Sequence, residues 1–72
     1  MILTVAESRK YLEGYYDLVI DDSQFQILDE SVCIWFAYAH KRTSGMSFPM
    51  VVRERTYIEL TSTAVLNFMQ DS

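Results

Sequence analysis

The stretch from Val32 to Ala39 reads VCIWFAYA and is the longest unbroken apolar run in the chain. In an extended strand, successive side chains point to opposite faces, so Trp35 would face one side of a sheet and Phe36 the other. A strand that is apolar on both faces is typical of the middle of a sheet, where both sides are covered. The run therefore predicts a central strand over residues 32–40.

Helices are predicted at both ends of the chain. Thr4 and Glu7 have the spacing of a capping box, in which the side chain of each residue accepts a hydrogen bond from the backbone amide of the other. The helix that follows is expected to end near Gly14, which can adopt a left-handed conformation. Residues 61–63 all carry hydroxyl groups and predict the start of a short last helix over residues 64–70.

The segments between these helices are rich in β-branched and aromatic residues. Residues 17–28 predict one or two extended segments with a weak break at Ser23-Gln24, followed by a turn at residues 29–31. Residues 48–60 predict a hairpin whose polar turn lies at residues 53–56. Pro49 cannot donate to a β-ladder, so it is expected at a strand start or on a sheet edge.

Length limits how these elements can be combined. A chain of 72 residues allows one domain, and its five Tyr, four Phe and one Trp can supply an apolar core without disulfides or metals. We therefore predict that residues 1–72 form a single α+β domain of two layers. Its parts are an N-terminal helix, a mainly antiparallel sheet of three to four strands and a short C-terminal helix.

Cys33 is the only cysteine, so an internal disulfide is impossible. Small secreted domains usually carry disulfides, and their absence favours a reducing compartment. Charged residues at Glu7, Arg9 and Lys10 interrupt the first apolar residues, unlike a signal peptide, and no stretch approaches the roughly 18 apolar residues of a membrane span. We expect a cytoplasmic protein that does not bind membranes.

The residue types that usually carry catalysis are poorly placed. Cys33 and His40 are an odd number of positions apart on one predicted strand, so they would lie on opposite faces and roughly 23 Å apart. Gly14 and Gly45 are isolated and form no phosphate-binding loop. We therefore predict no catalytic residues, no metal site and no cofactor, and we expect that the chain is not an enzyme.

The net charge of −4 is unevenly distributed. Residues 1–30 hold seven acids against Arg9 and Lys10, whereas basic residues outnumber acids by one in residues 31–72. This acidity disfavours direct nucleic-acid binding and favours a basic protein partner; the alternative is a solvated rim that maintains solubility. The predicted partner-binding residues are Tyr16, Asp17, Asp21, Asp22, Asp29 and Glu30.

Two further surface features remain open at this level. Of the adjacent Tyr15 and Tyr16, we expect one ring to face the core and the other to be more exposed. The exposed ring could anchor an interface or simply cover the end of the helix. An exposed sheet edge would also let two copies pair as a homodimer, although Pro49 blunts one candidate edge.

The order of elements resembles that of the YrhB-type bacterial immunity-protein family. The resemblance lies in the Trp-centred strand Ile34-Trp35-Phe36-Ala37-Tyr38, the Gly45 loop, the strand Pro49-Met50-Val51-Val52, the polar turn Arg53-Glu54-Arg55-Thr56, the strand Tyr57-Ile58-Glu59-Leu60 and the helix start Thr61-Ser62-Thr63. The Gly that commonly precedes the strand Trp in such proteins is replaced here by Val32-Cys33-Ile34.

This resemblance implies a protein that neutralises a cognate bacterial toxin, and it transfers no site residue. We therefore expect a small inhibitor or immunity protein that binds a partner, such as a toxin or a defence nuclease, through an acidic surface. The alternatives are a phage-encoded inhibitor of a host defence complex, whose acidity imitates nucleic-acid charge, and a non-catalytic accessory subunit of a homo- or hetero-oligomer.

Overall fold

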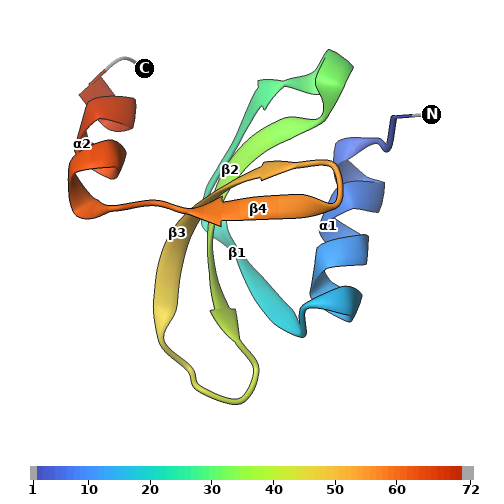
Figure 1. The fold of residues 1–72 in the computed structure, drawn as a ribbon, viewed down its shortest axis with the longest axis horizontal. Helices are drawn as coiled ribbons and strands as arrows, with labels where there is room; N and C mark the ends of the chain where they lie inside the picture. The colour runs from blue at the N-terminus through green and yellow to red at the C-terminus, as the bar shows by residue number, and fades with distance from the viewer. Residues whose placement is uncertain (1, 71–72) are drawn as a thin grey trace.

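The computed structural model describes residues 2–70, apart from the side chains of residues 68 and 69. Helices stand at both ends of the described chain, and four strands lie between them (Figure 1). In chain order the elements are α1 (Val5–Tyr15), β1 (Leu18–Asp29), the 3-10 turn η1 (Glu30–Val32), β2 (Ile34–Lys41), β3 (Ser47–Arg53), β4 (Thr56–Glu59) and α2 (Ser62–Gln70).

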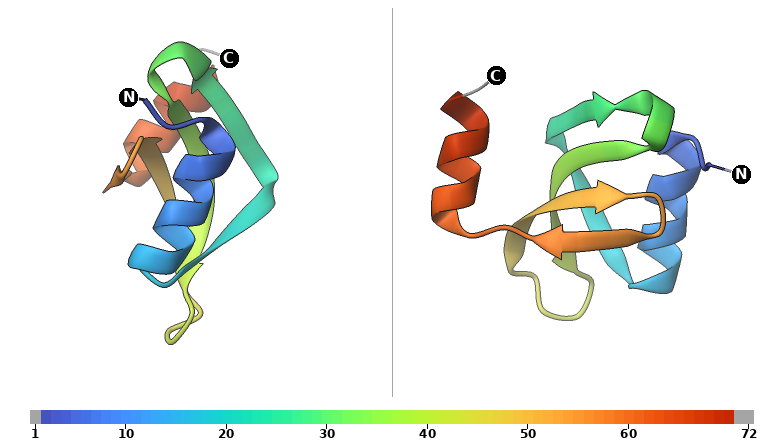
Figure 2. Two further views of the ribbon diagram at one scale, coloured as in Figure 1. Left: turned by 90° about the vertical axis from the view of Figure 1, so that its right-hand side faces the viewer. Right: turned by 45° about the horizontal axis from the view of Figure 1, so that its top comes forward.

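The four strands form one antiparallel sheet in the order β1-β2-β3-β4. This confirms the predicted α+β architecture and the interior position of β2, while β1 and β4 are the sheet edges. Helix α1 covers one face of the sheet, and α2 stands at its other side after a short connection from β4 (Figures 1 and 2). We call the face away from α1 the outer face; it carries Ile34, Phe36, Tyr38, Val51 and Ile58.

The capping box forms as predicted at the start of α1. The Thr4 amide donates to Glu7 Oε1 at 2.9 Å, and the Glu7 amide donates to Thr4 Oγ1 at 3.1 Å. The helix ends at Tyr15, one residue beyond the expected Gly14, and Gly14 does not take the left-handed conformation. The left-handed residue that reverses the chain is Asp17, with φ 57°, and a short polar side chain makes that conformation tolerable.

The core lies between α1 and the sheet face that it covers. Trp35 is fully buried there, its ring stacks on Phe25 at a centroid distance of 4.8 Å, and Leu12 of α1 is fully buried beside the same cluster. On the outer face Phe36 is buried, but Ile34 and Tyr38 are only half-buried. The prediction that β2 is covered on both sides is thus met fully on the Trp35 face and in part on the other.

A hydrogen-bonded junction ties α1 to the start of β2 and to the β3–β4 turn. The Trp35 indole N–H donates to Ser8 Oγ at 3.0 Å, and the Ser8 hydroxyl donates to the Glu54 carbonyl. The Glu54 amide donates to the Cys33 carbonyl at 3.0 Å. Ser8 is therefore a fully buried polar residue with one partner on β2 and one in the β3–β4 turn, which is how a polar group can be buried at little penalty.

The predicted start of the central strand at Val32 is wrong. The Asp29 carboxylate accepts from the Ser31 amide at 3.1 Å and from its hydroxyl at 2.6 Å, and this local capture begins the turn η1. Val32 belongs to that turn, and Cys33 is left-handed with φ 53°, so β2 begins only at Ile34. Short Asp and Ser side chains compete with the ladder in this way.

The weak break predicted at Ser23-Gln24 is an irregularity inside one long strand. The β1–β2 register shifts between Asp21 and Gln26, and the Ser23 amide donates to Asp21 Oδ1 at 2.9 Å. The strand bends there (Figure 2). A bulge of this kind interrupts pairing and increases local twist.

Pro49 lies near the start of β3, opposite Tyr38 of β2. β3 is an interior strand, so Pro49 does not lie on a sheet edge; it agrees with the other expected position, near the strand start, where β3 extends beyond the four residues of β4. Its carbonyl still accepts from the Leu60 amide at 2.9 Å. The missing Pro N–H therefore costs no ladder bond within the paired part of β4.

Candidate partner-binding surface

Aromatic rings form a continuous chain where α1 ends beside the β3–β4 hairpin. Tyr11 stacks on Tyr15 at 5.4 Å between ring centroids, and Tyr15 meets Tyr16 edge-on at 4.8 Å. Tyr16 meets Tyr57 edge-on at 5.0 Å, and Tyr57 lies 5.9 Å from Phe48. These five residues are called the tyrosine cluster below.

Local sequence explains how the cluster forms. Tyr11 and Tyr15 are four residues apart on α1, the spacing that places side chains one above the other on a helix face. Tyr57 of β4 pairs with the buried Val52, which places its ring on the α1 side of the sheet. The Tyr16 hydroxyl donates to the Arg55 carbonyl at 3.5 Å, so the helix end and the hairpin hold the cluster from both sides.

Exposure differs sharply within the cluster. Tyr15 is 69% exposed, whereas Tyr16, the predicted site residue, is half-buried between its neighbours. The Arg55 guanidinium lies 5.8 Å from the centre of the Tyr11 ring, which adds a cation–π contact at the cluster's rim. The spacing from Tyr11 to Tyr15 is the sequence signal for the stacking of these two rings, but the exposure of Tyr15 depends on where α1 ends.

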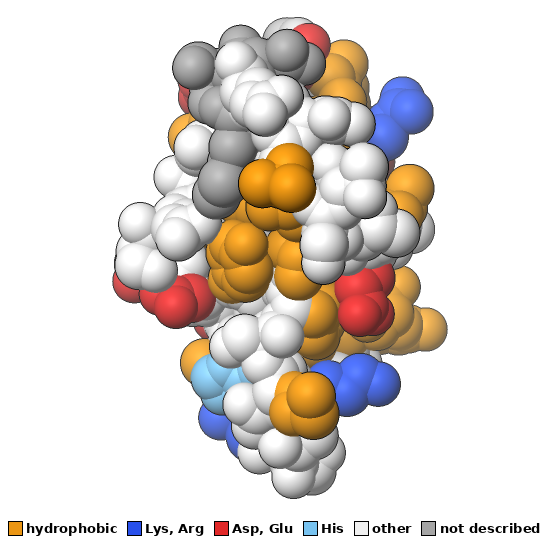
Figure 3. Space-filling view, turned by 90° about the vertical axis from the view of Figure 1, so that its left-hand side faces the viewer, with side chains coloured by type: hydrophobic (Ala, Val, Ile, Leu, Met, Phe, Trp, Pro, Cys, Tyr) orange, Lys and Arg blue, Asp and Glu red, His pale blue; other side chains and the backbone are white. Residues whose placement is uncertain are grey.

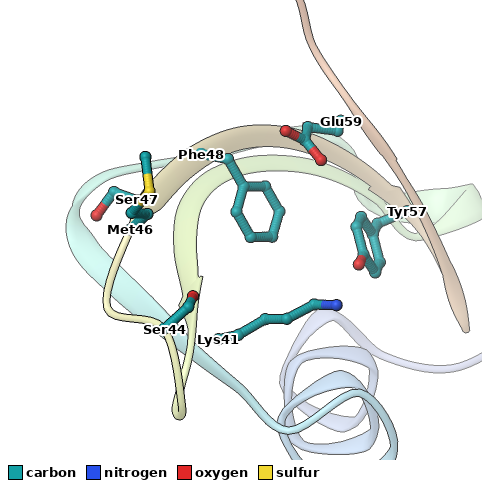
Figure 4. A pocket seen from close by; sticks show the side chains of 7 residues that line it. All are labelled: Lys41, Ser44, Met46, Ser47, Phe48, Tyr57 and Glu59. Carbon is teal, nitrogen blue, oxygen red and sulfur yellow. The ribbon is translucent and has the colours of Figure 1, made fainter.

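An open pocket of about 310 Å³ adjoins the cluster on the far side of Tyr57. The rings of Phe48 and Tyr57 face into it, and the Lys41 side chain extends along its floor toward Tyr57 (Figure 4). Met46 at its mouth is 78% exposed. The pocket therefore offers apolar ring surface with a cation within reach, and it extends the aromatic surface toward the β2–β3 loop.

A second hollow lies on the outer face, beside α2. It encloses about 490 Å³ and is lined by Tyr38, Pro49, Ser62, Val65 and Leu66. Figure 3 views the molecule from the α2 side and shows hydrophobic side chains gathered on this face. α2 thus covers the outer face only in part.

Two of the predicted acidic residues are engaged by arginines. Asp17 Oδ1 accepts from Arg42 Nε at 3.0 Å, and both side chains are exposed. Asp22 Oδ1 accepts from Arg9, whose guanidinium also donates to the Ile20 carbonyl at 3.0 Å. These pairs reduce the negative potential that Asp17 and Asp22 could present to a partner.

The other three predicted acids are exposed, and no salt bridge within the described chain involves them. Hydrogen bonds from the Ser23 amide and hydroxyl lower the pKa of Asp21. Hydrogen bonds from the Ser31 hydroxyl and then its amide lower the pKa of Asp29. Glu30 lies in η1 next to Asp29.

The structure therefore separates residues that the sequence places in one acidic segment. Tyr16 and Asp17 lie at the tyrosine cluster, whereas Asp21 and Asp22 lie midway along the edge strand β1. Asp29 and Glu30 follow at its far end, at the opposite side of the molecule (Figure 1). The acids form a line along a sheet edge and not a compact patch.

Cys33 and His40 do not approach one another. Cys33 is buried in the core, where its thiol lies 3.6 Å from the Thr4 carbonyl. His40 alternates with the buried Ala39 and so lies on the outer face. Among the described residues, no group of three or more His, Cys, Asp or Glu side chains is placed to bind a metal ion.

Comparisons with protein-family models, with curated proteins and with solved structures find no match to this chain. Within residues 2–70, neither helix combines the length and the apolar character that crossing a membrane requires.

Proposed function

We propose that this chain is a non-catalytic protein-binding module of the inhibitor or immunity type, which neutralises its partner by covering it. The observation that carries this proposal is Tyr15, which is 69% exposed and is packed between the rings of Tyr11 and Tyr16. An exposed ring held by its neighbours offers large contact area with little entropy left to lose. Such pre-ordered aromatic side chains are typical anchors of protein interfaces.

The composition around Tyr15 favours a protein partner. Tyr, Met and Arg are enriched at protein interfaces, and Tyr15, Met46 and Arg55 are all exposed here. The net charge of −4 opposes the phosphate backbone of a nucleic acid. A partner that presents apolar and basic groups would match this surface best.

Charge adds selectivity to this contact. Asp21, Asp29 and Glu30 are exposed and without a salt bridge in the described chain, so their fields are available to a basic partner. Complementary charge outside the contact mainly raises the association rate. A basic toxin or defence nuclease fits this requirement, and the resemblance to YrhB-type immunity proteins supports the toxin.

A second candidate is supported by the outer face. The hollow beside α2 and the half-buried Ile34 and Tyr38 leave apolar surface that a larger chain could cover. This observation favours a non-catalytic accessory subunit of an oligomer.

Affinity capture from the native host tests the first proposal directly. The bait is the full chain, compared with Tyr15→Ser and with the matched variant Leu66→Ser, which alters a 60% exposed residue on α2 away from the cluster. We expect one partner to be retained by the wild type and by Leu66→Ser but lost with Tyr15→Ser. Loss with Leu66→Ser alone would instead favour the accessory subunit.

Association kinetics with the captured partner test the role of charge. Asp21→Lys and Glu30→Lys together should slow association by about tenfold at low salt, because they reverse two fields that steer a basic partner. The difference should shrink as ionic strength rises. An association rate that is unchanged at low salt would remove the acids from the proposal and leave the aromatic contact standing.

A further inference from the structure

Strand β4 is one edge of the sheet, and half of its backbone N–H and C=O groups point away from β3. The Leu60 amide donates to the Pro49 carbonyl, and the β3–β4 register pairs Val51 with Ile58. Hydrogen-bonded pairs alternate along an antiparallel ladder, so Ile58 bonds to β3 while Tyr57 and Glu59 turn their N–H and C=O groups to the free edge. No described strand pairs with that edge.

The side chains of β4 do little to protect this edge. Natural edge strands are guarded by Lys, Pro, bulges or inward-pointing charges. β4 reads Thr-Tyr-Ile-Glu and has no Lys, no Pro and no register irregularity with β3. Its one charge, Glu59, pairs with the buried Met50 and so lies on the α1 side, which leaves the outer face of the edge without a charge. Ile58 is 70% exposed on the outer face. A β-branched apolar residue between two outward-facing backbone pairs is a template for another strand.

We propose that β4 pairs with β4 of a second copy of this chain, antiparallel, about a two-fold axis at Ile58. The two sheets then continue into one another. Tyr57 of each copy exchanges both backbone hydrogen bonds with Glu59 of the other, and the two Ile58 side chains meet on the axis. The outward groups of β4 are complementary to themselves in this arrangement, as an isologous interface requires.

Pairing with the two-fold axis at either neighbouring residue is less favourable. An axis at Glu59 would place two carboxylates opposite each other, which is destabilising. An axis at Tyr57 would place Glu59 opposite Arg55, which lies in the turn and not in a strand. With the axis at Ile58, each Glu59 faces an uncharged Tyr57, and Ile58 occupies a non-hydrogen-bonded site where opposite Cα atoms lie about 4.5 Å apart.

The charge distribution favours a second copy at this edge. Residues 31–72, which include β4, carry one more basic than acidic residue, while the excess of acids lies in residues 1–30. β1 is separated from β4 by the whole width of the sheet. Five of the seven acids of residues 1–30 lie along β1 or next to its ends, so in two joined copies these five lie at the far ends of the sheet, where their mutual repulsion is weakest.

Sedimentation of the full chain over a range of concentrations tests the proposal. The wild type should pass from 8.4 kDa to twice that mass as concentration rises, since an interface made by one short strand pair is weak. Ile58→Lys should raise the dissociation constant by at least about tenfold because it places two like charges on the axis. Leu66→Lys, on α2, should leave it unchanged. Circular dichroism confirms that both variants are folded.

Cross-linking and hydrogen exchange test the register. Oxidised Ile58→Cys should form a covalent dimer, because the expected Cα separation suits a disulfide, whereas Ile27→Cys at the exposed part of β1 should not. The Tyr57 and Glu59 amides should gain protection on concentration while the Ile58 amide stays protected throughout. A monomer at millimolar concentration, or equal cross-linking of both Cys variants, would overturn the proposal. A dimer insensitive to Ile58→Lys would do the same.

Discussion

The two edge strands, β1 and β4, both expose unpaired backbone groups, and they limit pairing with other chains in different ways. β1 has twelve residues, a bulge after Asp21, and Arg9 of α1 donating to the outward carbonyl of Ile20. β4 has four residues, a regular register and an exposed Ile58. A long free strand is a strong template for aggregation, so it needs guards; a strand of four residues offers few bonds and can remain open.

The acidic segment, residues 17–30, has structural roles at the β1 edge. Asp22 orients the arginine that covers the β1 edge, Asp21 holds the bulge, and Asp29 ends the strand by forming η1. Each of these acids therefore serves the fold whether or not it also meets a partner. Glu30 is the acid of this segment that has no such structural role in the described chain. Tyr15 is the exposed aromatic residue that lies just before the segment in the sequence.

Trp35→Ala should have the largest effect, because it disconnects both edges from the centre. The ring stacks on Phe25 of β1, and its N–H binds Ser8, which holds the β3–β4 turn. Emptying this site should lower the free energy of unfolding by about 3–5 kcal/mol. Urea denaturation followed by circular dichroism measures it.

Trp35→Phe is the matched control for that substitution. It retains much of the ring contact but removes the N–H that donates to Ser8, so its loss should be smaller, about 1–2 kcal/mol. A loss below about 1 kcal/mol for Trp35→Ala would contradict the central role of this side chain.

The position of Trp35 shows how much of the fold was predictable. An apolar run around it, a capping box and two hydroxyl-rich or polar turns predicted the order of helices and strands. The chain reversals at Asp17, Cys33 and Glu54 were not predictable, although all three are left-handed. Their conformations depend on partners distant in the sequence, such as Arg42 for Asp17 and the bond between Cys33 and Glu54.

The candidate site was less predictable than the fold. Sequence shows that five acids occur close together, but it does not show that an extended strand carries them from one side of the molecule to the other. Nor does it show which residues of an edge strand meet arginines from other elements, as Asp17 and Asp22 do. The choice between Tyr15 and Tyr16 depended on where α1 ends, and that end lay one residue beyond Gly14.

Arg9→Ala should destabilise the β1 edge and leave the β4 edge unchanged. It removes the bonds to the Ile20 carbonyl and to Asp22, and a cation–π contact with Phe25 at 5.4 Å. We expect a loss of about 1–2 kcal/mol in unfolding free energy, together with light scattering that increases on heating. Lys10→Ala, at the exposed neighbouring position, is the control and should change neither quantity. Equal behaviour of the two variants would show that Arg9 does not guard β1.

Acidification should lower the unfolding free energy by a smaller amount, through the two carboxylates of β1, Asp21 and Asp29. Hydrogen bonds within the Asx turns hold the pKa of Asp21 and of Asp29 below the ordinary value of 3.8. A lowered pKa in the folded state means that the contribution is complete above the unfolded-state pKa and disappears as the pH falls through the folded one. Stability should therefore be level near neutral pH and decline below about pH 4.

The double variant Asp21→Asn, Asp29→Asn separates these carboxylates from the rest of the chain. Asn keeps a side-chain acceptor for both turns but does not titrate, so the decline in unfolding free energy below pH 4 should become shallower. Urea denaturation at a series of pH values measures the slope. An identical slope in the variant would mean that other carboxylates, such as Glu7 in the capping box, dominate acid unfolding.

Ile58→Thr should have the smallest effect on the isolated chain. Ile58 is 70% exposed, and Thr retains β-branching, so unfolding free energy measured at high dilution should change by less than about 0.5 kcal/mol. The same substitution at Ile20, which is 4% exposed in the guarded strand, buries a hydroxyl and should lower stability by about 1–3 kcal/mol. If β4 pairs with its copy, the difference between the losses of stability at Ile58 and at Ile20 should become smaller at high concentration, because Ile58 is buried only in the dimer. A cost at Ile58 that is large and independent of concentration would mean that β4 is already covered within a single chain.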